Sequence, residues 1–100
     1  MASSTTDARL TDNAGTRRYE LRLGDAVGGF IFYRLSDGTI TLIHTEVDPA
    51  YEGQGVGAAL VAAALDDIRA RGLRLVPLCP FVRSYIDRHP EYGDLVVADE

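Results

Sequence analysis

Three glycines occupy alternate positions in the segment Glu52-Gly53-Gln54-Gly55-Val56-Gly57-Ala58. Glycine adopts a positive φ without strain, and because it lacks a Cβ a ligand can approach its main chain closely. The segment precedes a predicted helix, whose first amides have no acceptor within the helix and lie at the positive end of the helix dipole. We therefore predict that the main chain of this loop binds a pyrophosphate or a similar anion.

Other interpretations of the glycine loop are available. Gly53, Gly55 and Ala58 match the dinucleotide-binding pattern G-x-G-x-x-A, but that fold needs an acidic residue after the next strand, where this chain has Cys79. A Walker P-loop is excluded, because the chain has no Gly-Lys-Ser or Gly-Lys-Thr. The competing structural interpretation is a tight strand-to-helix turn that binds nothing. Such a turn needs one or two glycines, so we expect the third to serve a ligand.

Two side chains before the loop are candidate general bases. His44 has a reference pKa of about 6.5 and can accept a proton at neutral pH. Glu46 lies two residues further along the same predicted strand. The alternative interpretation is that His44 and Glu46 are surface residues of the sheet without a chemical role.

Two more candidates follow the helix. Cys79 precedes a second predicted helix, and a thiol beside a helix N-terminus ionises more readily than a free one. It is a candidate nucleophile, a pocket wall or a small buried core residue. Arg83 is a candidate contact for a cofactor phosphate, with a solvated surface arginine as the alternative.

The elements that position these residues follow from hydrophobic periodicity. The predicted elements are, in order, strands over residues 18–23, 26–35 and 39–47, a helix over 55–71, a strand over 73–78 and a helix over 81–88. Short turns make the first three strands an antiparallel meander, and the helical crossover makes the fourth strand parallel to the third. We therefore predict an α+β fold of order β-β-β-α-β-α with a mixed sheet.

Two details of the strands bear on the site. Gly28-Gly29 inside the second strand predicts a bulge or a close approach of two backbones. Alternation along residues 39–47 places His44 and Glu46 on the same face as Ile40 and Leu42.

The chain has 100 residues, which is one domain, and its 46% hydrophobic and 25% charged residues are ordinary globular values. We expect a flexible leader over residues 1–16, the domain over 17–97 and a frayed tail over 98–100. A net charge of −5 disfavours nucleic-acid binding through a basic surface. The absence of lysine excludes a Schiff-base lysine, and the single cysteine excludes an internal disulfide and a cysteine-rich zinc site. No apolar run is long enough to span a bilayer, so we expect a cytoplasmic protein. We also expect no bound metal.

Taken together, the motifs resemble a known family. Val47-Asp48-Pro49, followed by the glycine loop and an alanine-rich helix, looks like motif A of the GNAT (N-acetyltransferase) superfamily. Pro77-Leu78-Cys79-Pro80-Phe81-Val82 and His89-Pro90-Glu91-Tyr92 resemble more specifically its small, single-domain GNAT-like branch. The resemblance covers about residues 18–97.

The resemblance implies a minimal GNAT-like (acyl-CoA N-acyltransferase) fold and an N-acetyltransferase that uses acetyl-CoA as co-substrate. It implies that residues 42–47 separate from the next strand to admit the pantetheine arm, and that strand amides, Val47 among them, hold the oxyanion. It implies that Cys79 carries the acetyl group with His44 as its partner, or lines the pocket. Tyr85 lies on the helix where larger members place a tyrosine general acid. The residues that bind the cofactor would then be Val47, Glu52, Gly53, Gln54, Gly55, Val56, Gly57, Ala58 and Arg83.

The chain departs from the superfamily at Glu52, where glutamine or arginine is usual, so only the main chain of this residue would face the phosphates. The expected acceptor is an amine of a small molecule or peptide, and the expected assembly is a monomer or homodimer. Two rivals remain: a non-catalytic acyl-CoA-binding module, and an interaction domain whose glycines serve only the turn.

Overall fold

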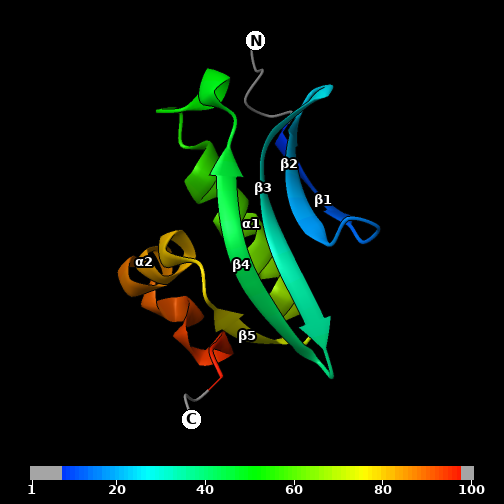
Figure 1. Ribbon diagram of the computed structural model, residues 1–100. Coiled ribbons are helices and arrows are strands. Elements are labelled where there is room, and N and C mark those ends of the chain that lie inside the picture. Colours follow the sequence, from blue (N-terminus) through cyan, green and yellow to red (C-terminus); the bar gives the residue numbers. More distant parts are fainter. Residues whose placement is uncertain (1–7, 98–100) are drawn as a thin grey trace.

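Five strands form one mixed sheet in the order β1-β2-β3-β4-β5 (Figure 1). The computed structural model describes residues 8–97. β1 to β4 pair antiparallel, and β5 pairs parallel with β4. The elements are β1 (Ala8–Asn13), β2 (Arg18–Leu23), β3 (Ala26–Ser36), β4 (Thr39–Val47), the short 3-10 helix η2 (Pro49–Tyr51), α1 (Val56–Ala70), β5 (Arg74–Pro77), α2 (Pro80–Arg88) and η3 (Pro90–Leu95).

The predicted α+β class, mixed sheet and order of elements are confirmed from β2 to α2. Both helices form where the periodicity indicated. α1 ends at Ala70, and Gly72 follows its C-cap Arg71 with a φ of +69°, the left-handed conformation expected of a terminating glycine. The helix α1 lies behind the sheet in Figure 1, and α2 lies beside β4 and β5. One face of the sheet is therefore covered by α1, and we call the opposite face of β2, β3 and β4 the outer face.

The core lies between the inner face of the sheet and α1. Leu60, Leu65 and Ile68 of α1 are fully buried, as are Tyr19 of β2 and Ile31 of β3. Burying one large apolar side chain contributes about 1.5–3 kcal/mol. In the absence of any disulfide involving Cys79, this packing between α1 and the sheet holds the strands in place.

The leader predicted over residues 1–16 is wrong for residues 8–13, which form β1 and pair with β2 from Ala8↔Leu23 to Asn13↔Arg18. The rest of the expected leader before residue 8, and the expected tail over residues 98–100, lie outside the described residues.

Polar contacts from distant parts of the chain hold β1. Asp12 accepts hydrogen bonds from the Tyr33 hydroxyl and from Arg71, which follows α1. Arg71 also donates to the Tyr19 hydroxyl, and Tyr19 donates to Asp67 at 2.7 Å. Burial and the hydrogen bond to Asp12 raise the pKa of Tyr33 to about 12. The polar composition of this segment suggested a mobile leader. Its Asp12 side chain instead finds hydrogen-bond partners in distant parts of the chain, which local periodicity does not reveal.

The predicted irregularity at Gly28-Gly29 is confirmed. The β2–β3 register shifts there, since Leu21 pairs with Gly29 and Arg22 with Val27. A Cβ at Gly29 would lie 2.9 Å from the main-chain oxygen of Glu46 on β4. Glycine therefore allows the two backbones to approach closely.

A second irregularity changes the faces of β4. Phe32 pairs with His44, but the next residue of β3 pairs with Leu42, which leaves Ile43 as an extra residue on β4. Leu42 is fully buried, whereas His44 and Glu46 lie on the outer face and are exposed. The prediction that His44 and Glu46 share a face with Leu42 is therefore wrong, because one extra residue reverses the alternation after it.

Candidate functional site

The strands β4 and β5 separate halfway along β4. Their pairing ends at Leu42↔Pro77, and beyond it the amides of Leu78 and Cys79 both donate to the same acceptor, the Leu42 carbonyl, at 3.0 Å. Within residues 8–97, the remaining part of β4, residues 43–47, has no strand partner on this side. The predicted separation of these strands is therefore present.

The amide of Val47 faces this gap. The next amide, that of Asp48, donates to the Gly28 carbonyl on the β3 side at 2.8 Å. Successive amides of a strand point to opposite sides, so the Val47 amide points toward the separation between β4 and β5. An unpaired amide in this position can stabilise a negative oxygen.

Each glycine of the loop has its own structural reason. Gly53 and Gly55 have φ values of +82° and +79°, and Gly55 is the N-cap of α1. Gly57 is helical, but a Cβ there would lie 2.8 Å from the Phe81 ring. The turn therefore accounts for two of the glycines, as expected, and the third, Gly57, is explained by its contact with Phe81 without a ligand. Their number alone does not indicate a ligand, and the loop must be judged by its amides.

Four consecutive amides at the start of α1 are free. The first helical hydrogen bond runs from Ala59 to the Gly55 carbonyl. In the part of the chain that the structure describes, the amides of residues 55–58 have no acceptor. No acidic side chain lies in the first turn of α1, so nothing there opposes an anion.

The start of the loop is different. The amide of Glu52 donates to the Pro49 carbonyl and that of Gln54 to the Tyr51 carbonyl, both at 3.3 Å. The Asp48 carboxylate accepts from the Ala50 amide and so caps η2. This geometry therefore does not support the prediction that the amides of Glu52 and Gln54 also face the ligand. Among residues 52–58, the amides without an acceptor are those of Gly53 and of residues 55–58.

His44 and Glu46 form a pair on the outer face. The imidazole Nε2 lies 3.0 Å from a Glu46 carboxylate oxygen, and the side chains are 56% and 57% exposed. Phe32 and Phe30 of β3 lie opposite them and contact each other edge to face, with centroids 5.1 Å apart. The pair can accept a proton from a molecule bound on this face.

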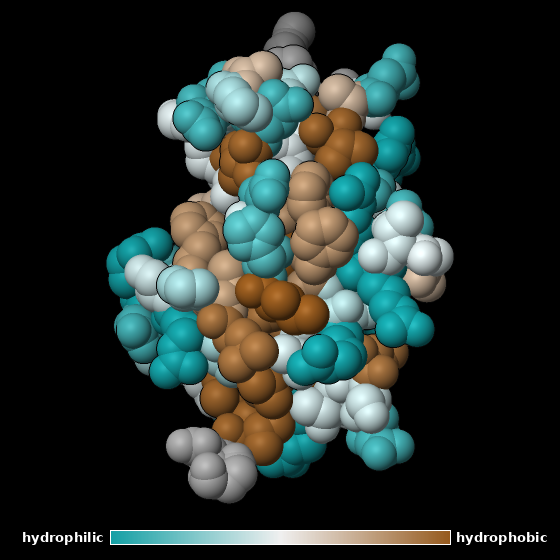
Figure 2. Space-filling model, in the orientation of Figure 1, coloured by the Kyte–Doolittle hydropathy of each residue, from teal (hydrophilic) through white to brown (hydrophobic). Residues whose placement is uncertain are grey.

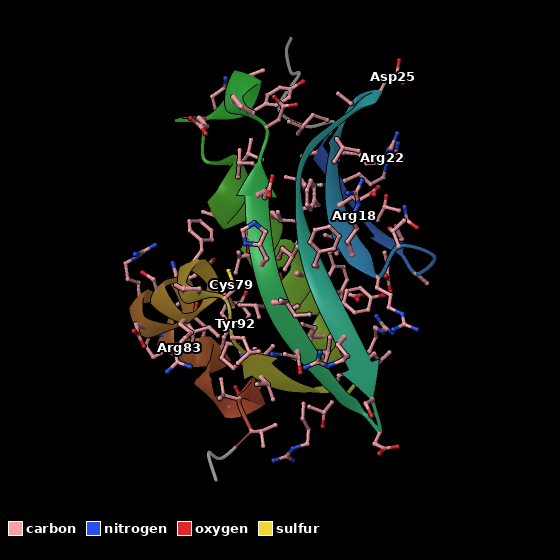
Figure 3. All side chains as sticks on the ribbon, viewed as in Figure 1. Arg18, Arg22, Asp25, Cys79, Arg83 and Tyr92 are labelled. Carbon is pink, nitrogen blue, oxygen red and sulfur yellow. The ribbon has the colours of Figure 1, made fainter. Side chains whose placement is uncertain are left out.

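Cys79 lies on the other side of β4 from His44. The thiol is buried, and its sulfur lies 3.3 Å from the hydroxyl of Thr45, which pairs with the buried Ile31. Figure 3 shows Cys79 between β4 and α2. The Cys79–His44 pair, one of the alternatives for Cys79, is therefore not formed, because the two side chains lie on opposite faces of β4 and the imidazole contacts Glu46.

Two predicted residues of α2 point elsewhere. Tyr85 is buried, and its ring packs against His89 with centroids 4.1 Å apart and against Tyr92 at 6.1 Å. Arg83 donates to the Pro77 carbonyl at 3.3 Å. Because the Arg83 side chain is directed to the Pro77 carbonyl, the geometry does not support a phosphate contact at the start of α1.

Sequence reasoning missed the part that Phe81 plays. Phe81 is 42% exposed, and its ring covers Gly57 at the start of α1. Ile43 and Leu78 are also exposed near the separation of β4 and β5. Figure 2 shows apolar atoms in an irregular band along this face, with hydrophilic atoms on both sides. These exposed side chains could contact an apolar ligand arm.

Across residues 8–97 no group of three or more histidine, cysteine, aspartate or glutamate side chains could hold a metal ion. In the same residues no helix is long and apolar enough to cross a membrane.

The order of elements agrees with comparisons to known proteins. The family model of the GCN5-related N-acetyl-transferases matches residues 18–95. The chain therefore belongs to this family, as the motifs indicated.

Several curated proteins are similar to this chain in sequence. NATD1 of Homo sapiens is 35% identical over 51 residues, which are 51% of this chain and 45% of that protein. NATD1 of Danio rerio is 27% identical over 96 residues, covering 92% of this chain and 87% of that protein. The chain spans about half the length of the first curated relatives it matches.

The NMR structure of a GCN5-like protein from Staphylococcus aureus has a TM-score of 0.67 at 24% identity and covers 95% of this chain and 93% of that chain. It shows the same fold. The ribosomal-protein-S18-alanine N-acetyltransferase of Escherichia coli has a TM-score of 0.53 at 29% identity, covering 58% of this chain and 38% of that chain. The GNAT-like fold expected from the sequence is confirmed.

Proposed function

We propose that the protein transfers an acetyl group from acetyl-CoA to a primary amine. The observation that carries the proposal is the continuity of two features. The gap beside residues 43–47 leads directly to the four free amides at residues 55–58. A ligand with an extended arm and a pyrophosphate matches this combination.

The proposed binding mode uses the main chain. The amides of Gly55, Val56, Gly57 and Ala58 receive the pyrophosphate at the positive end of α1. The pantetheine arm lies along the open side of β4, where Phe81 supplies an apolar contact. This mode needs no basic side chain, which suits a chain with a net charge of −5.

The chemistry follows from the positions of the polar groups. The acceptor amine loses a proton to the His44–Glu46 pair, and its nitrogen forms a bond to the thioester carbonyl. The Val47 amide holds the oxyanion. The carbon–sulfur bond then breaks, and the thiolate of CoA leaves and takes up a proton. Tyr85 as the donor of that proton stays a prediction.

The geometry favours direct transfer over an acetyl-cysteine intermediate. A nucleophilic cysteine needs a base within hydrogen-bond reach, and the thiol of Cys79 contacts only the Thr45 hydroxyl among the polar groups of residues 8–97. We therefore assign Cys79 to the wall of the gap.

Release of CoA thiol in the presence of acetyl-CoA and a panel of primary amines tests the proposal. Glu46→Gln should lower kcat by a factor of about 10² if the pair acts as a general base. The matched control is Glu91→Gln, because Glu91 also lies near an exposed histidine, with 3.8 Å between His89 Nδ1 and Glu91 Oε2. Binding of acetyl-CoA without thiol release for any amine would favour the non-catalytic binding module, and no binding would favour a turn without a ligand.

A further inference from the structure

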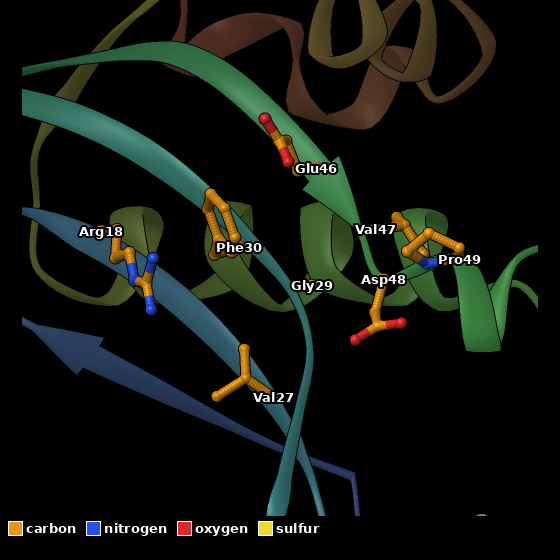
Figure 4. Close-up of a pocket in the computed structure, with 8 residues that line it drawn as sticks. All are labelled: Arg18, Val27, Gly29, Phe30, Glu46, Val47, Asp48 and Pro49. Carbon is orange, nitrogen blue, oxygen red and sulfur yellow. The ribbon is translucent and has the colours of Figure 1, made fainter.

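The outer face carries a hollow of about 260 Å³ beside the proposed reaction centre (Figure 4). Its wall combines three strands with the start of η2. The lining residues are Arg18, Val27, Gly29, Phe30, Glu46, Val47, Asp48 and Pro49. Since Glu46 belongs both to this wall and to the His44–Glu46 pair, a molecule in the hollow can present an amine to that pair.

One wall of the hollow is cationic. The Arg18 guanidinium lies over the Phe30 ring, 4.3 Å from its centroid, and its Nε donates to Glu20 at 2.7 Å. The two Nη atoms have no hydrogen-bond partner within residues 8–97. Two contacts thus hold the guanidinium in place and leave its terminal nitrogens available for a carboxylate.

The opposite wall is anionic. Glu46 on β4 pairs with Phe30 on β3, and Arg18 lies on β2, so Arg18 and Glu46 are two strands apart, roughly 10 Å between backbones. Asp48 supplies a second carboxylate, of which one oxygen accepts from the Ala50 amide. Figure 4 shows Arg18 and Asp48 on opposite sides of the hollow, with the Phe30 ring and Val27 between them.

We infer that the acceptor is a zwitterionic α-amino acid. Its carboxylate would bind the Nη atoms of Arg18, and its ammonium group would lie at Glu46 and Asp48. The side chain of the amino acid would contact Phe30 and Val27. A simple amine would leave the Arg18 fork unpaired, and a simple carboxylic acid would meet the two acidic groups. The inference rests on the proposed function, because it assigns the acceptor of that reaction.

The transfer balances without another reactant. The bound ammonium group loses one proton to the Glu46–His44 pair, and its nitrogen attacks the thioester carbon. The new bond is an amide, and the bond that breaks joins that carbon to the sulfur of CoA. The products are the N-acetyl amino acid, CoA thiol and one proton.

The test compares L-leucine with L-leucinamide as acceptors. The two differ only in the carboxylate, and the amide has the less basic amine, so a preference for leucine cannot come from a larger fraction of free amine. The wild-type protein should show a kcat/KM at least about tenfold higher for leucine. Arg18→Gln should lower the value for leucine to about that for leucinamide. The matched control Arg22→Gln should keep the preference, because Arg22 also approaches Glu20, at 3.6 Å, but does not line the hollow.

Each result decides between the two proposals. Equal turnover of leucine and leucinamide by the wild-type protein would overturn the inference and leave the proposed function intact. If neither is acetylated, the amine panel decides the proposed function, which fails only when no amine releases CoA thiol, and amide NMR spectra of the CoA-loaded protein test the hollow separately. Shifts of Gly29 and Val47 with leucine but not with leucinamide would support it, and their absence would overturn it. Both ligand comparisons use the wild-type chain, so they hold even if Arg18→Gln does not fold.

Discussion

Replacing Gly55 by alanine separates the two roles of the glycine loop. Gly55 has a φ of +79° and, as the N-cap, presents the free amides of α1. Alanine in the left-handed region costs roughly 1–2 kcal/mol. Either the methyl group projects into the open space beside the loop, or the backbone relaxes and moves the amides. Both outcomes weaken the binding of a phosphate.

Gly72 supplies a matched control. Its φ is +69°, and a Cβ there would also meet nothing within 4 Å, but it lies at the other end of α1. Gly72→Ala should therefore cost a similar 1–2 kcal/mol. In a domain of this size each kcal/mol lowers Tm by roughly 4–8 °C. Without ligand the two variants should unfold at similar temperatures, both below the wild type.

Thermal unfolding with CoA distinguishes them. At a concentration one hundred times the wild-type Kd, CoA should stabilise the wild type and Gly72→Ala by about 2.7 kcal/mol. If Gly55→Ala weakens binding tenfold, its stabilisation should fall to about 1.4 kcal/mol. An equal CoA-induced shift in the two variants would refute the assignment of the free amides to the phosphates.

Three further predictions concern other parts of the molecule. Cys79→Ala should retain most of its kcat, and the wild type incubated with acetyl-CoA should show no acetyl adduct on Cys79 by mass spectrometry; a stoichiometric adduct would restore the covalent route. The hydrogen bond from Arg18 lowers the pKa of Glu20, so this carboxylate stabilises the fold above its ordinary pKa and the contribution is lost as the pH falls through the folded value. Urea unfolding of Glu20→Gln should therefore depend less on pH between neutrality and acid than that of the wild type, and parallel curves would contradict this. Asp12→Ala leaves the Tyr33 hydroxyl without its acceptor and should cost about 1–3 kcal/mol in urea unfolding, whereas the exposed-turn control Asp25→Ala should change little.

Much of the fold was accessible from local patterns. The bounds of β2 and β4, the helix α1 and its termination before Gly72 follow from periodicity and from the conformational freedom of glycine. These are properties of neighbouring residues, so a single chain displays them. The same applies to the free amides at residues 55–58, because every helix leaves its first amides without partners.

The arrangement of the reacting groups depended on the tertiary structure. One extra residue at Ile43 moves His44 and Glu46 to the outer face and separates them from Cys79. The periodicity of β4 does not reveal this, because a bulge is set by the register against β3. The sequence therefore identified the candidate residues and left the place of Cys79 open, and the register of β4 decided that it lies apart from His44.

The strand β1 and the outer hollow show the same limit. β1 is polar, and its Asp12 is held by hydrogen bonds from Tyr33 and Arg71, which lie 21 and 59 residues away in the sequence. The hollow joins Arg18 of β2 to Glu46 of β4 across Phe30, although no local motif links them. The sequence by itself determined which segments fold and where an anion can bind. Only the packing of distant segments decided which side chains face one another, because those contacts depend on register and burial rather than on sequence neighbours.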